Sequence, residues 1–458
     1  MNVAINPVLD KDFCPAVLWN RAYNEAAEKT SGSQPVTIGL FRDDTIVARR
    51  TLAVLPDVDR SFKYLERLLK TMLWAVGGNR ILFDGPDALF DRLKKHYTDS
   101  PGGRFDSQII GEKIYDHALQ IEKARAGEIL EPSRQGAALG RHLDGCRIGF
   151  DLGGSDRKCA ALIDGKVVFS EEIKWDPYFQ NNPQYHYLGI LDSLKRAEAH
   201  LPRVDAIGGS AAGVYVNNEV RVASLFRGVS SDQFESDVRP IFKKLKKAWN
   251  DIPFEVVNDG EVTALAGAMA LNDNAVLGIS MGTSLAAGYV TPEGKITSWL
   301  NELAFVPVDY RENGPVDEWS GDIGCGVQYF SQQGVARLAP LSGIQFPANM
   351  PFAEQLVEVQ RLMAEGDLRA RKIYETIGVC FGYAIAYFAD FYEFRNLLIL
   401  GRVTSGEGGQ IIIEKAKEVL NVEFPELAST VKISMPDEQM KRHGQAVAAA
   451  SLPMVRGK

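Results

Sequence analysis

The stretch GISMGTSLAAGYV, residues 278–290, is an apolar strand pattern that Gly282, Thr283 and Ser284 interrupt at its middle. A Gly-Thr turn between two apolar runs is common, and by itself it indicates no more than a β-hairpin. Glycine also lets backbone N–H groups approach an anion closely, and the two hydroxyls can add donors. Whether this turn binds an anion therefore depends on what accompanies it along the chain.

Two further glycine turns follow buried-strand patterns. DLGGS, residues 151–155, ends the apolar run that starts at Cys146, and LGRVTSGEGG, from Leu400, ends another. These turns are neither a Walker loop nor a G-x-G-x-x-G motif. We interpret the turns at 151–155 and 282–284 as hairpins that grip a polyphosphate from both sides. Because a carboxylate and a phosphate repel each other, Asp151 is expected to act through Mg²⁺ and its waters.

Between these turns lies a candidate catalytic carboxylate. In EVVNDGEVTALAGA, residues 255–268, Asn258 and Asp259 end a buried strand and open a small-residue helix. Asp259 is placed to accept a proton from a substrate hydroxyl that attacks a γ-phosphate, and Asn258 to orient that substrate. The alternative is that Asp259 only caps the helix, which is a frequent role of aspartate. Its position between the two glycine turns favours catalysis.

Composition restricts the class of protein. The chain has 458 residues, enough for two or three domains, and its 45% hydrophobic and 24% charged residues are typical of a soluble globular protein. The net charge of -8 gives no electrostatic reason to expect binding to nucleic acid or to an acidic membrane surface. Five scattered cysteines without a C-x-x-C favour a reducing compartment. With no signal-peptide pattern and no long apolar run, the sequence predicts a cytoplasmic protein.

The chain alternates strand and helix patterns throughout, which predicts an α/β fold. Residues 1–121 form a first α/β region with a strand pair over 36–55 and a helix from Phe62. Residues 122–145 are polar and contain glycine and proline, and we interpret them as a connector. The alternating pattern restarts at Cys146 and continues to a buried closing helix, GQAVAAASL.

The order of the motifs GFDLGGSDRKCAALID, VVNDGEVTALAGA and LGISMGTSLAAGYV resembles the ROK family of sugar kinases and regulators, over roughly residues 146–455. This family has the two-lobed, actin-like and hexokinase-like (ribonuclease H-like) ATPase fold, with ATP in the cleft. The resemblance implies a small lobe of residues 146–259 plus 441–458 and a large lobe of residues 260–440. Residues 1–121 are an additional α/β domain, which we expect to be a decayed half-domain that packs on the small lobe.

The resemblance also implies a role for each motif residue. Asp259 is the general base. The sugar contacts are Asn258, Glu302 and Gly213. Gly401 lies on the adenosine side. The contacts to the ATP phosphates are Asp151 (with Mg²⁺, through water), Gly153, Gly154, Ser155, Lys158, Gly282, Thr283 and Ser284.

Several positions depart from the family pattern. The family motif E-x-G-H is here ELAF, residues 302–305, and the family C-x-C-G-x-x-G-C-x-E is EWSGDIGCGV, residues 318–327. A lone Cys325 cannot make a Cys₃His site, so no structural zinc is expected. The acidic residues near it could offer oxygen ligands, but we interpret them as a solvated loop: Asp309, Asp317, Glu318 and Asp322.

Other departures bear on the substrates. Phe305 and Val327 stand where the family has polar sugar contacts, which predicts a more apolar pocket, and Arg402 replaces a glycine on the adenine side. Losing polar partners for sugar hydroxyls should reduce specificity.

The sequence therefore predicts an ATP-dependent kinase that phosphorylates a hydroxyl of a hexose or related sugar. Its expected partners are a small-molecule sugar and ATP, with no nucleic acid or membrane, and the family makes a homodimer an expectation. The alternatives are a weak or inactive sugar-binding regulator or sensor and a degenerate scaffold. Residues 1–121 show no helix-turn-helix, which argues against a DNA-binding repressor.

Overall fold

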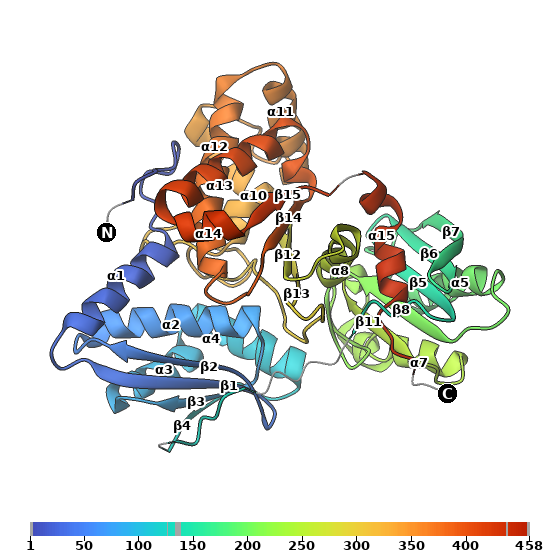
Figure 1. Ribbon diagram of the computed structural model, residues 1–458, viewed down its shortest axis with the longest axis horizontal. Coiled ribbons are helices and arrows are strands. Elements are labelled where there is room, and N and C mark those ends of the chain that lie inside the picture. The colour runs from blue at the N-terminus through green and yellow to red at the C-terminus, as the bar shows by residue number, and fades with distance from the viewer. Residues whose placement is uncertain (1–2, 126, 133–138, 437, 456–458) are drawn as a thin grey trace.

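The computed structural model describes residues 3–125, 127–132, 139–436 and 438–455. Figure 1 shows three α/β bodies: an N-terminal domain in blue, a small lobe in green and a large lobe in orange, with the C-terminal helix in red against the small lobe. No helix in these residues is both long and apolar enough to cross a bilayer.

The small lobe is built on a five-stranded sheet in the order β11-β8-β5-β6-β7. The neighbours β5, β6 and β7 are antiparallel, whereas β8 and β11 run parallel to β5. Every residue of β5 is buried, as its apolar sequence predicts for a central strand. The strands are β5 (Cys146–Leu152), β6 (Asp156–Ile163), β7 (Lys166–Lys174), β8 (Ala206–Ala211) and β11 (Phe254–Asn258). The other elements are α5 (Pro183–Glu198), β9 (Val214–Val216), β10 (Glu219–Val222), η2 (Ser224–Phe226), α6 (Ser231–Gln233), η3 (Phe234–Val238) and α7 (Ile241–Ala248).

Two glycines allow the closing helix, α15 (Glu438–Ala450), to lie on this sheet. A Cβ on Gly149 would lie 1.8 Å from the carbonyl oxygen of Ala446, and one on Gly208 would lie 1.7 Å from that of Ala449. Only glycine fits at such a distance, so the helix backbone contacts the sheet directly. The C-terminal helix thus packs on strands of the small lobe, although more than two hundred residues separate them.

The large lobe repeats this topology without one edge strand. Its sheet has the order β13-β12-β14-β15, with an antiparallel β12–β13 hairpin followed by two parallel strands. The strands are β12 (Val276–Met281), β13 (Leu285–Val290), β14 (Asn396–Leu400) and β15 (Lys432–Ser434). The helices are α8 (Asp259–Leu271), α9 (Val327–Phe330), α10 (Gln332–Ser342), α11 (Phe352–Ala364), α12 (Leu368–Phe388), η4 (Arg402–Thr404), α13 (Glu407–Glu423) and α14 (Pro425–Thr430).

The N-terminal domain has a four-stranded sheet in the order β2-β1-β3-β4. Its first two strands are the predicted hairpin. The strands are β1 (Gln34–Arg42), β2 (Thr45–Val54), β3 (Arg80–Asp84) and β4 (Gln120–Lys123). The helices are α1 (Ala16–Lys29), α2 (Val58–Ala75), α3 (Asp87–Asp99), α4 (Pro101–Asp106) and η1 (Ser107–Ile114). The connector expected at 122–145 thus begins inside β4, and its residues 126 and 133–138 lie outside the described residues.

The N-terminal domain packs mainly on the large lobe, and the prediction that it packs on the small lobe is wrong. One buried cluster joins Leu69 and Leu73 of α2 to large-lobe residues such as Val306. A backbone bond from the amide of Ala16 to the carbonyl of Val308, 3.0 Å long, adds to this interface. The reason is the apolar face of α2, which needs a large partner surface and finds it there.

Candidate nucleotide and acceptor site

The first glycine turn joins β5 to β6 and is held by aromatic side chains that follow β7. The amide of Gly153 donates to the carbonyl of Asp156 (2.9 Å), and the indole of Trp175 donates to the carbonyl of Gly153 (2.8 Å). A Cβ on Gly154 would lie 2.1 Å from the hydroxyl oxygen of Tyr178, so the ring of Tyr178 packs directly against the backbone of the turn. The turn is therefore preorganised before any ligand binds.

Asp151 and Lys158 face each other across this hairpin, where they form a register pair of β5 and β6. The ammonium of Lys158 lies 3.9 Å from the carboxylate of Asp151 and 3.5 Å from that of Asp156. Burial raises the pKa of Asp151, and Lys158 opposes that rise. Ser155 is exposed at the tip of the turn, where its hydroxyl donates to Asp156 (2.9 Å).

The second glycine turn joins β12 to β13. The amide of Gly282 donates to the carbonyl of Ser284 (2.9 Å), and the carbonyl of Gly282 accepts from the amide of Gln332 (2.9 Å). Thr283 and Ser284 are exposed, so their hydroxyls are accessible to a ligand. The heavy atom nearest to a Cβ on Gly282 would be the carbonyl oxygen of Ser284, at 3.7 Å. A side chain here would therefore point into open space.

The third glycine turn lies beside the second. Strand β14 runs parallel to β12, with Leu400 opposite Ser280, so both strands end at the same edge of the sheet. Gly401 has φ +102°, and a Cβ there would lie 2.4 Å from the carbonyl oxygen of Met281, the residue before the second turn. Arg402, which stands where the family has a glycine, is exposed.

Helix α8 starts between the lobes, and its first residue is Asp259. Asn258 is the N-cap: its side-chain oxygen accepts from the amide of Gly260 (2.7 Å), while its side-chain amide donates to the carbonyl of Gly213 (2.8 Å). Asp259 accepts from the same amide of Gly260 at 3.0 Å. Because Asn258 already caps the helix, this role does not account for the carboxylate of Asp259.

Close packing brings the start of α8 to the hairpin that carries the second turn. A Cβ on Gly260 would lie 2.4 Å from the carbonyl of Ala287, and one on Gly288 would lie 2.0 Å from the carbonyl of Gly260. Paired glycines thus let a helix and a strand touch by their backbones. Asp259 is held beside β13 as a result.

Three carboxylates from three separate segments interact electrostatically here. Burial and the neighbouring charge of Asp151 raise the pKa of Asp259 to about 6. Burial and the charge of Asp259 likewise raise the pKa of Glu302 to about 7. A carboxylate with a pKa near neutrality is suited to accept a proton and release it again. Asp151, Asp259 and Glu302, predicted from distant motifs, are therefore brought together.

The N-terminal domain holds Glu302 in position. The sequence predicted Glu302 as a site residue but did not suggest this support. The amides of Leu300, Asn301 and Glu302 donate to the carbonyls of Val76, Ala75 and Trp74, at 3.3, 3.0 and 3.0 Å. The last carbonyls of a helix have no partner within it, so residues 300–302 satisfy the C-terminus of α2. No local signal could reveal this contact, because its two halves are more than two hundred residues apart.

A second buried carboxylate was also missed. Glu261, in the first turn of α8, accepts from the side-chain amide of Asn301 (3.3 Å). Burial raises its pKa to about 8, so the side chain is largely protonated at neutral pH. Its place two residues after Asp259, in the segment NDGE, was the only available clue.

The four acidic residues near Cys325 were expected in a solvated loop; Glu318 is exposed as expected, but the prediction is wrong for the other three. Asp309 and Asp317 are buried. Asp322 lies 2.9 Å from Lys70 and 3.0 Å from Arg67, both on α2. Burial opposes ionisation of Asp322, but these two cations hold its pKa well below its usual range.

The same region carries the two apolar replacements. The ring of Phe305 lies 4.2 Å from that of Trp74 in the N-terminal domain, and it is half-buried, whereas Val327 is fully buried. In the part of the chain that the structure describes, no group of three or more His, Cys, Asp and Glu side chains could hold a metal ion.

Neither a protein-family model nor a curated protein matches this sequence. Solved structures do resemble it. The ROK hexokinase from Thermus thermophilus is 16% identical with a TM-score of 0.53, and the match covers 67% of this chain and 97% of that one. The ROK family glucokinase from Streptomyces griseus, solved with glucose and AMPPNP, is 18% identical with a TM-score of 0.50, covering 68% and 99%. A ROK family transcriptional regulator, a homologue of the E. coli MLC protein, is 18% identical with a TM-score of 0.50. That match covers 68% of this chain and 79% of the regulator.

These likenesses define the fold. The chain has the two-lobed α/β fold of the hexokinase-like ATPases, as the sequence predicted. Within that class, its fold is the one seen in ROK sugar kinases, and that prediction is confirmed as well. The covered share of this chain is close to the share that residues 146–458 make up.

Proposed function

We propose that this protein transfers the γ-phosphoryl group of ATP to a hydroxyl of a hexose or related sugar. The observation that carries the proposal is Asp259, a half-buried carboxylate with a pKa raised to about 6, at a helix start between two glycine turns. The proposal also draws on the fold, which ROK hexokinases and glucokinases share.

The residues present fit ATP and Mg²⁺. Bound MgATP would supply the phosphoryl group, with the metal ion offsetting the charge of the phosphates. Gly153, Gly154 and Ser155 would bind phosphate from one side, and Gly282, Thr283 and Ser284 from the other. Lys158 would add a positive charge beside Asp151, which would hold Mg²⁺ through water. Gly401 would bound the adenosine.

The chain's own chemistry is proton transfer. As the sugar oxygen bonds to the γ-phosphorus and the bond to ADP breaks, Asp259 would take the proton of the hydroxyl. Asn258, Glu302 and Gly213 would orient the sugar; the fixed bond between Asn258 and Gly213 supports this arrangement. Glu302 is held by the N-terminal domain, so that domain would contribute indirectly to substrate binding.

The domain boundaries are part of the proposal. We assign residues 146–259 with 441–458 to the small lobe and residues 260–440 to the large lobe. The contacts of α15 with β5 and β8 support the first assignment. The continuous sheet β13-β12-β14-β15 supports the second.

A second candidate is a sugar-binding regulator or sensor that does not phosphorylate and does not bind DNA. Phe305, packed on Trp74 in place of a polar sugar contact, favours this alternative. One solved structure of similar fold is described as a transcriptional regulator.

The deciding experiment measures ADP release from MgATP with a panel of hexoses, amino sugars and polyols. We expect turnover of at least one sugar by the natural protein and loss of that turnover in Asp259→Asn. A protein that binds ATP and sugar but releases no ADP would contradict the kinase and support the sensor.

A further inference from the structure

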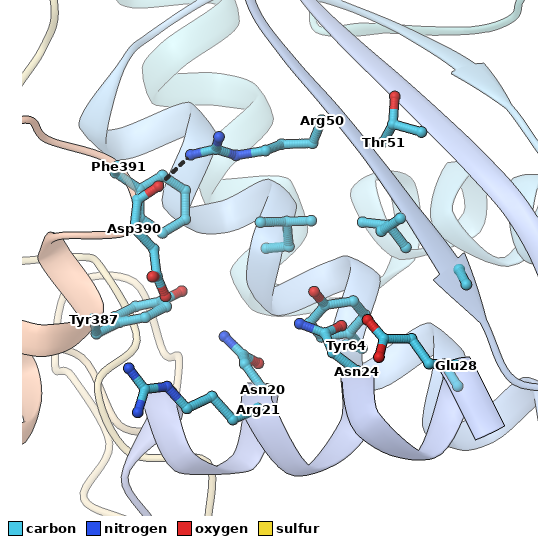
Figure 2. Close-up of a pocket in the computed structure, with 14 residues that line it drawn as sticks. Asn20, Arg21, Asn24, Glu28, Arg50, Thr51, Tyr64, Tyr387, Asp390 and Phe391 are labelled. Atoms are coloured by element: carbon cyan, nitrogen blue, oxygen red, sulfur yellow. Dashed lines mark hydrogen bonds between the residues drawn. The ribbon is translucent and has the colours of Figure 1, made fainter. Parts of the chain in front are cut away.

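A cavity of about 440 Å³ lies at the seam between the N-terminal domain and the large lobe. It belongs to neither the glycine turns nor the carboxylate cluster. Helices α1 and α2 and strand β2 form three of its sides, and the end of α12 forms the fourth (Figure 2). The residues that line it are Asn20, Arg21, Asn24, Ala27, Glu28, Arg50, Thr51, Leu52, Ala53, Tyr64, Leu68, Tyr387, Asp390 and Phe391.

The walls of this seam cavity are rigid. The ring of Tyr64 stacks on that of Tyr23 at 4.3 Å. The hydroxyl of Tyr387 lies 2.6 Å from that of Thr71 and 3.2 Å from that of Tyr310. The walls formed by α1, α2 and α12 are thus fixed by contacts behind them, in the way that preformed ligand sites are built.

One buried polar atom beside the cavity lacks a hydrogen-bond partner in the described part of the chain. Asn20 is 7% exposed, and its side-chain oxygen accepts no hydrogen bond from any described residue. A buried polar atom of this kind calls for a water molecule or a ligand. Figure 2 shows the side chains of Asn20 and Asp390 directed between the walls. Asp390 is exposed, and its carboxylate forms no ion pair within 4.0 Å in the described part of the chain, while its main-chain carbonyl accepts from the guanidinium of Arg50 (2.5 Å).

The mixture of groups selects the ligand. Two guanidinium groups, Arg21 and Arg50, balance two carboxylates, Glu28 and Asp390, so the cavity favours neither an anion nor a cation. The carboxamides, the hydroxyl of Thr51 and the phenol of Tyr64 add both donors and acceptors, and the aromatic rings offer apolar faces. A hydroxyl group donates and accepts at once, so a compact molecule with many hydroxyls can use these partners best.

We propose that the seam cavity is a second small-molecule site, which takes an uncharged polyhydroxylated ligand of monosaccharide size. The volume lies within the range of about 300–1,000 Å³ that is usual for such sites. Because both the N-terminal domain and α12 line it, a bound ligand stabilises their interface by mass action. The proposal does not rest on the kinase activity, since binding here needs neither ATP nor Asp259.

The test is calorimetric titration of the full-length protein, without ATP, against glucose, N-acetylglucosamine and glucitol. Glucose 6-phosphate and glutamate test for anionic and zwitterionic ligands. Asn24→Leu removes one carboxamide of the cavity, and Glu25→Leu, at the next position of α1 but outside the cavity, is its matched control. Glu302→Ala removes any binding event at the candidate acceptor site.

We expect at least one of the three uncharged probes to bind, and Asn24→Leu to weaken that binding about tenfold, because the variant loses a half-buried carboxamide that can hydrogen-bond to the ligand. Glu25→Leu and Glu302→Ala should leave that binding unchanged. Thermal unfolding checks that Asn24→Leu is folded; should it not be, Thr51→Trp, which fills the cavity from its exposed side, takes its place. Binding by glucose 6-phosphate or glutamate alone, no binding at all, or binding that only Glu302→Ala removes would overturn the proposal.

Discussion

Among single side chains, Asp259 determines the expected pH dependence of the proposed reaction. A general base acts in its deprotonated form, and burial with Asp151 raises the pKa of Asp259 to about 6. The value of kcat/KM should therefore rise with pH through about pH 6. Rate measurements from pH 4.5 to 8.5 test this expectation, with the exposed Asp232→Asn as a control that should keep the profile. If kcat/KM instead rose with a midpoint near pH 4, the assignment of Asp259 as the general base would be contradicted.

The same pKa predicts an effect on stability. The folded protein binds the proton of Asp259 more tightly than the unfolded chain does, so stability falls as pH rises from about 4 to about 6 and stays reduced above. Asp259→Asn removes the buried charge and should stabilise the protein at pH 8 by ~1–3 kcal/mol, while lowering turnover by about 10²–10⁴-fold.

Denaturant unfolding of Asp259→Asn at pH 8 and at pH 4 measures that effect, because the gain should vanish at the lower pH. The exposed Asp232→Asn should change stability at neither pH. A variant that is less stable than the natural protein at pH 8 would show that the carboxylate is instead paired in the fold.

Among the structural elements, the second glycine turn offers a direct test of nucleotide binding. Because a Cβ on Gly282 would come no closer than 3.7 Å to a heavy atom, Gly282→Val should fold normally. Its side chain should occupy the space of a phosphate and abolish ATP binding. Thr283→Val removes only a hydroxyl and should weaken ATP about tenfold. Titration with ATP checks both, and unchanged affinity of folded Gly282→Val would refute the phosphate role.

Helix α2 supplies another test, because its Lys70 is almost fully buried between Asp106 and Asp322, at 2.9 Å from each. Lys70→Met leaves the buried Asp106 without its cation and Asp322 with Arg67 alone, which should cost ~3–5 kcal/mol. Lys94→Met on α3, an exposed position, should cost nearly nothing. Denaturant unfolding compares the two variants. A cost for Lys70→Met as small as that of the control would mean that the network adds no stability.

These elements also show what the sequence could predict. The strands around Gly153, Gly282 and Gly401 were predictable because their apolar runs and glycine turns are local signals. The polar strand β4, with the sequence QIEK, was missed because it carries no such signal. The loop around Asp322 was misinterpreted because its partner cations on α2 lie some 250 residues earlier in the chain. Sequence patterns report neighbours along the chain, and these contacts are distant along it.

In the molecule as a whole, the N-terminal domain and the large lobe share one buried hydrophobic cluster. The small lobe meets the N-terminal domain differently, through ion pairs of Arg221 and Arg239 with Asp116, whose side chain is exposed to solvent. Such pairs contribute about 0–1 kcal/mol each, so they resist lobe movement only weakly. Any closure of the cleft is therefore expected to move the N-terminal domain and the large lobe as one body against the small lobe.

This arrangement predicts that the N-terminal domain and the large lobe unfold together. Opening the N-terminal domain alone would expose the apolar face of α2 and break its hydrogen bonds to residues 300–302. The free energy needed to open this domain alone should therefore equal the free energy needed to unfold it together with the large lobe. Native-state hydrogen exchange should give the same opening free energy for amides in β1 and β3 as for those in β12 and β14. If the amides of β1 exchange through an opening of lower free energy while those of β12 stay protected, the N-terminal domain instead unfolds independently of the large lobe. In that case Glu302 would lose its support without global unfolding, and turnover should fall under the same mild denaturant that opens β1.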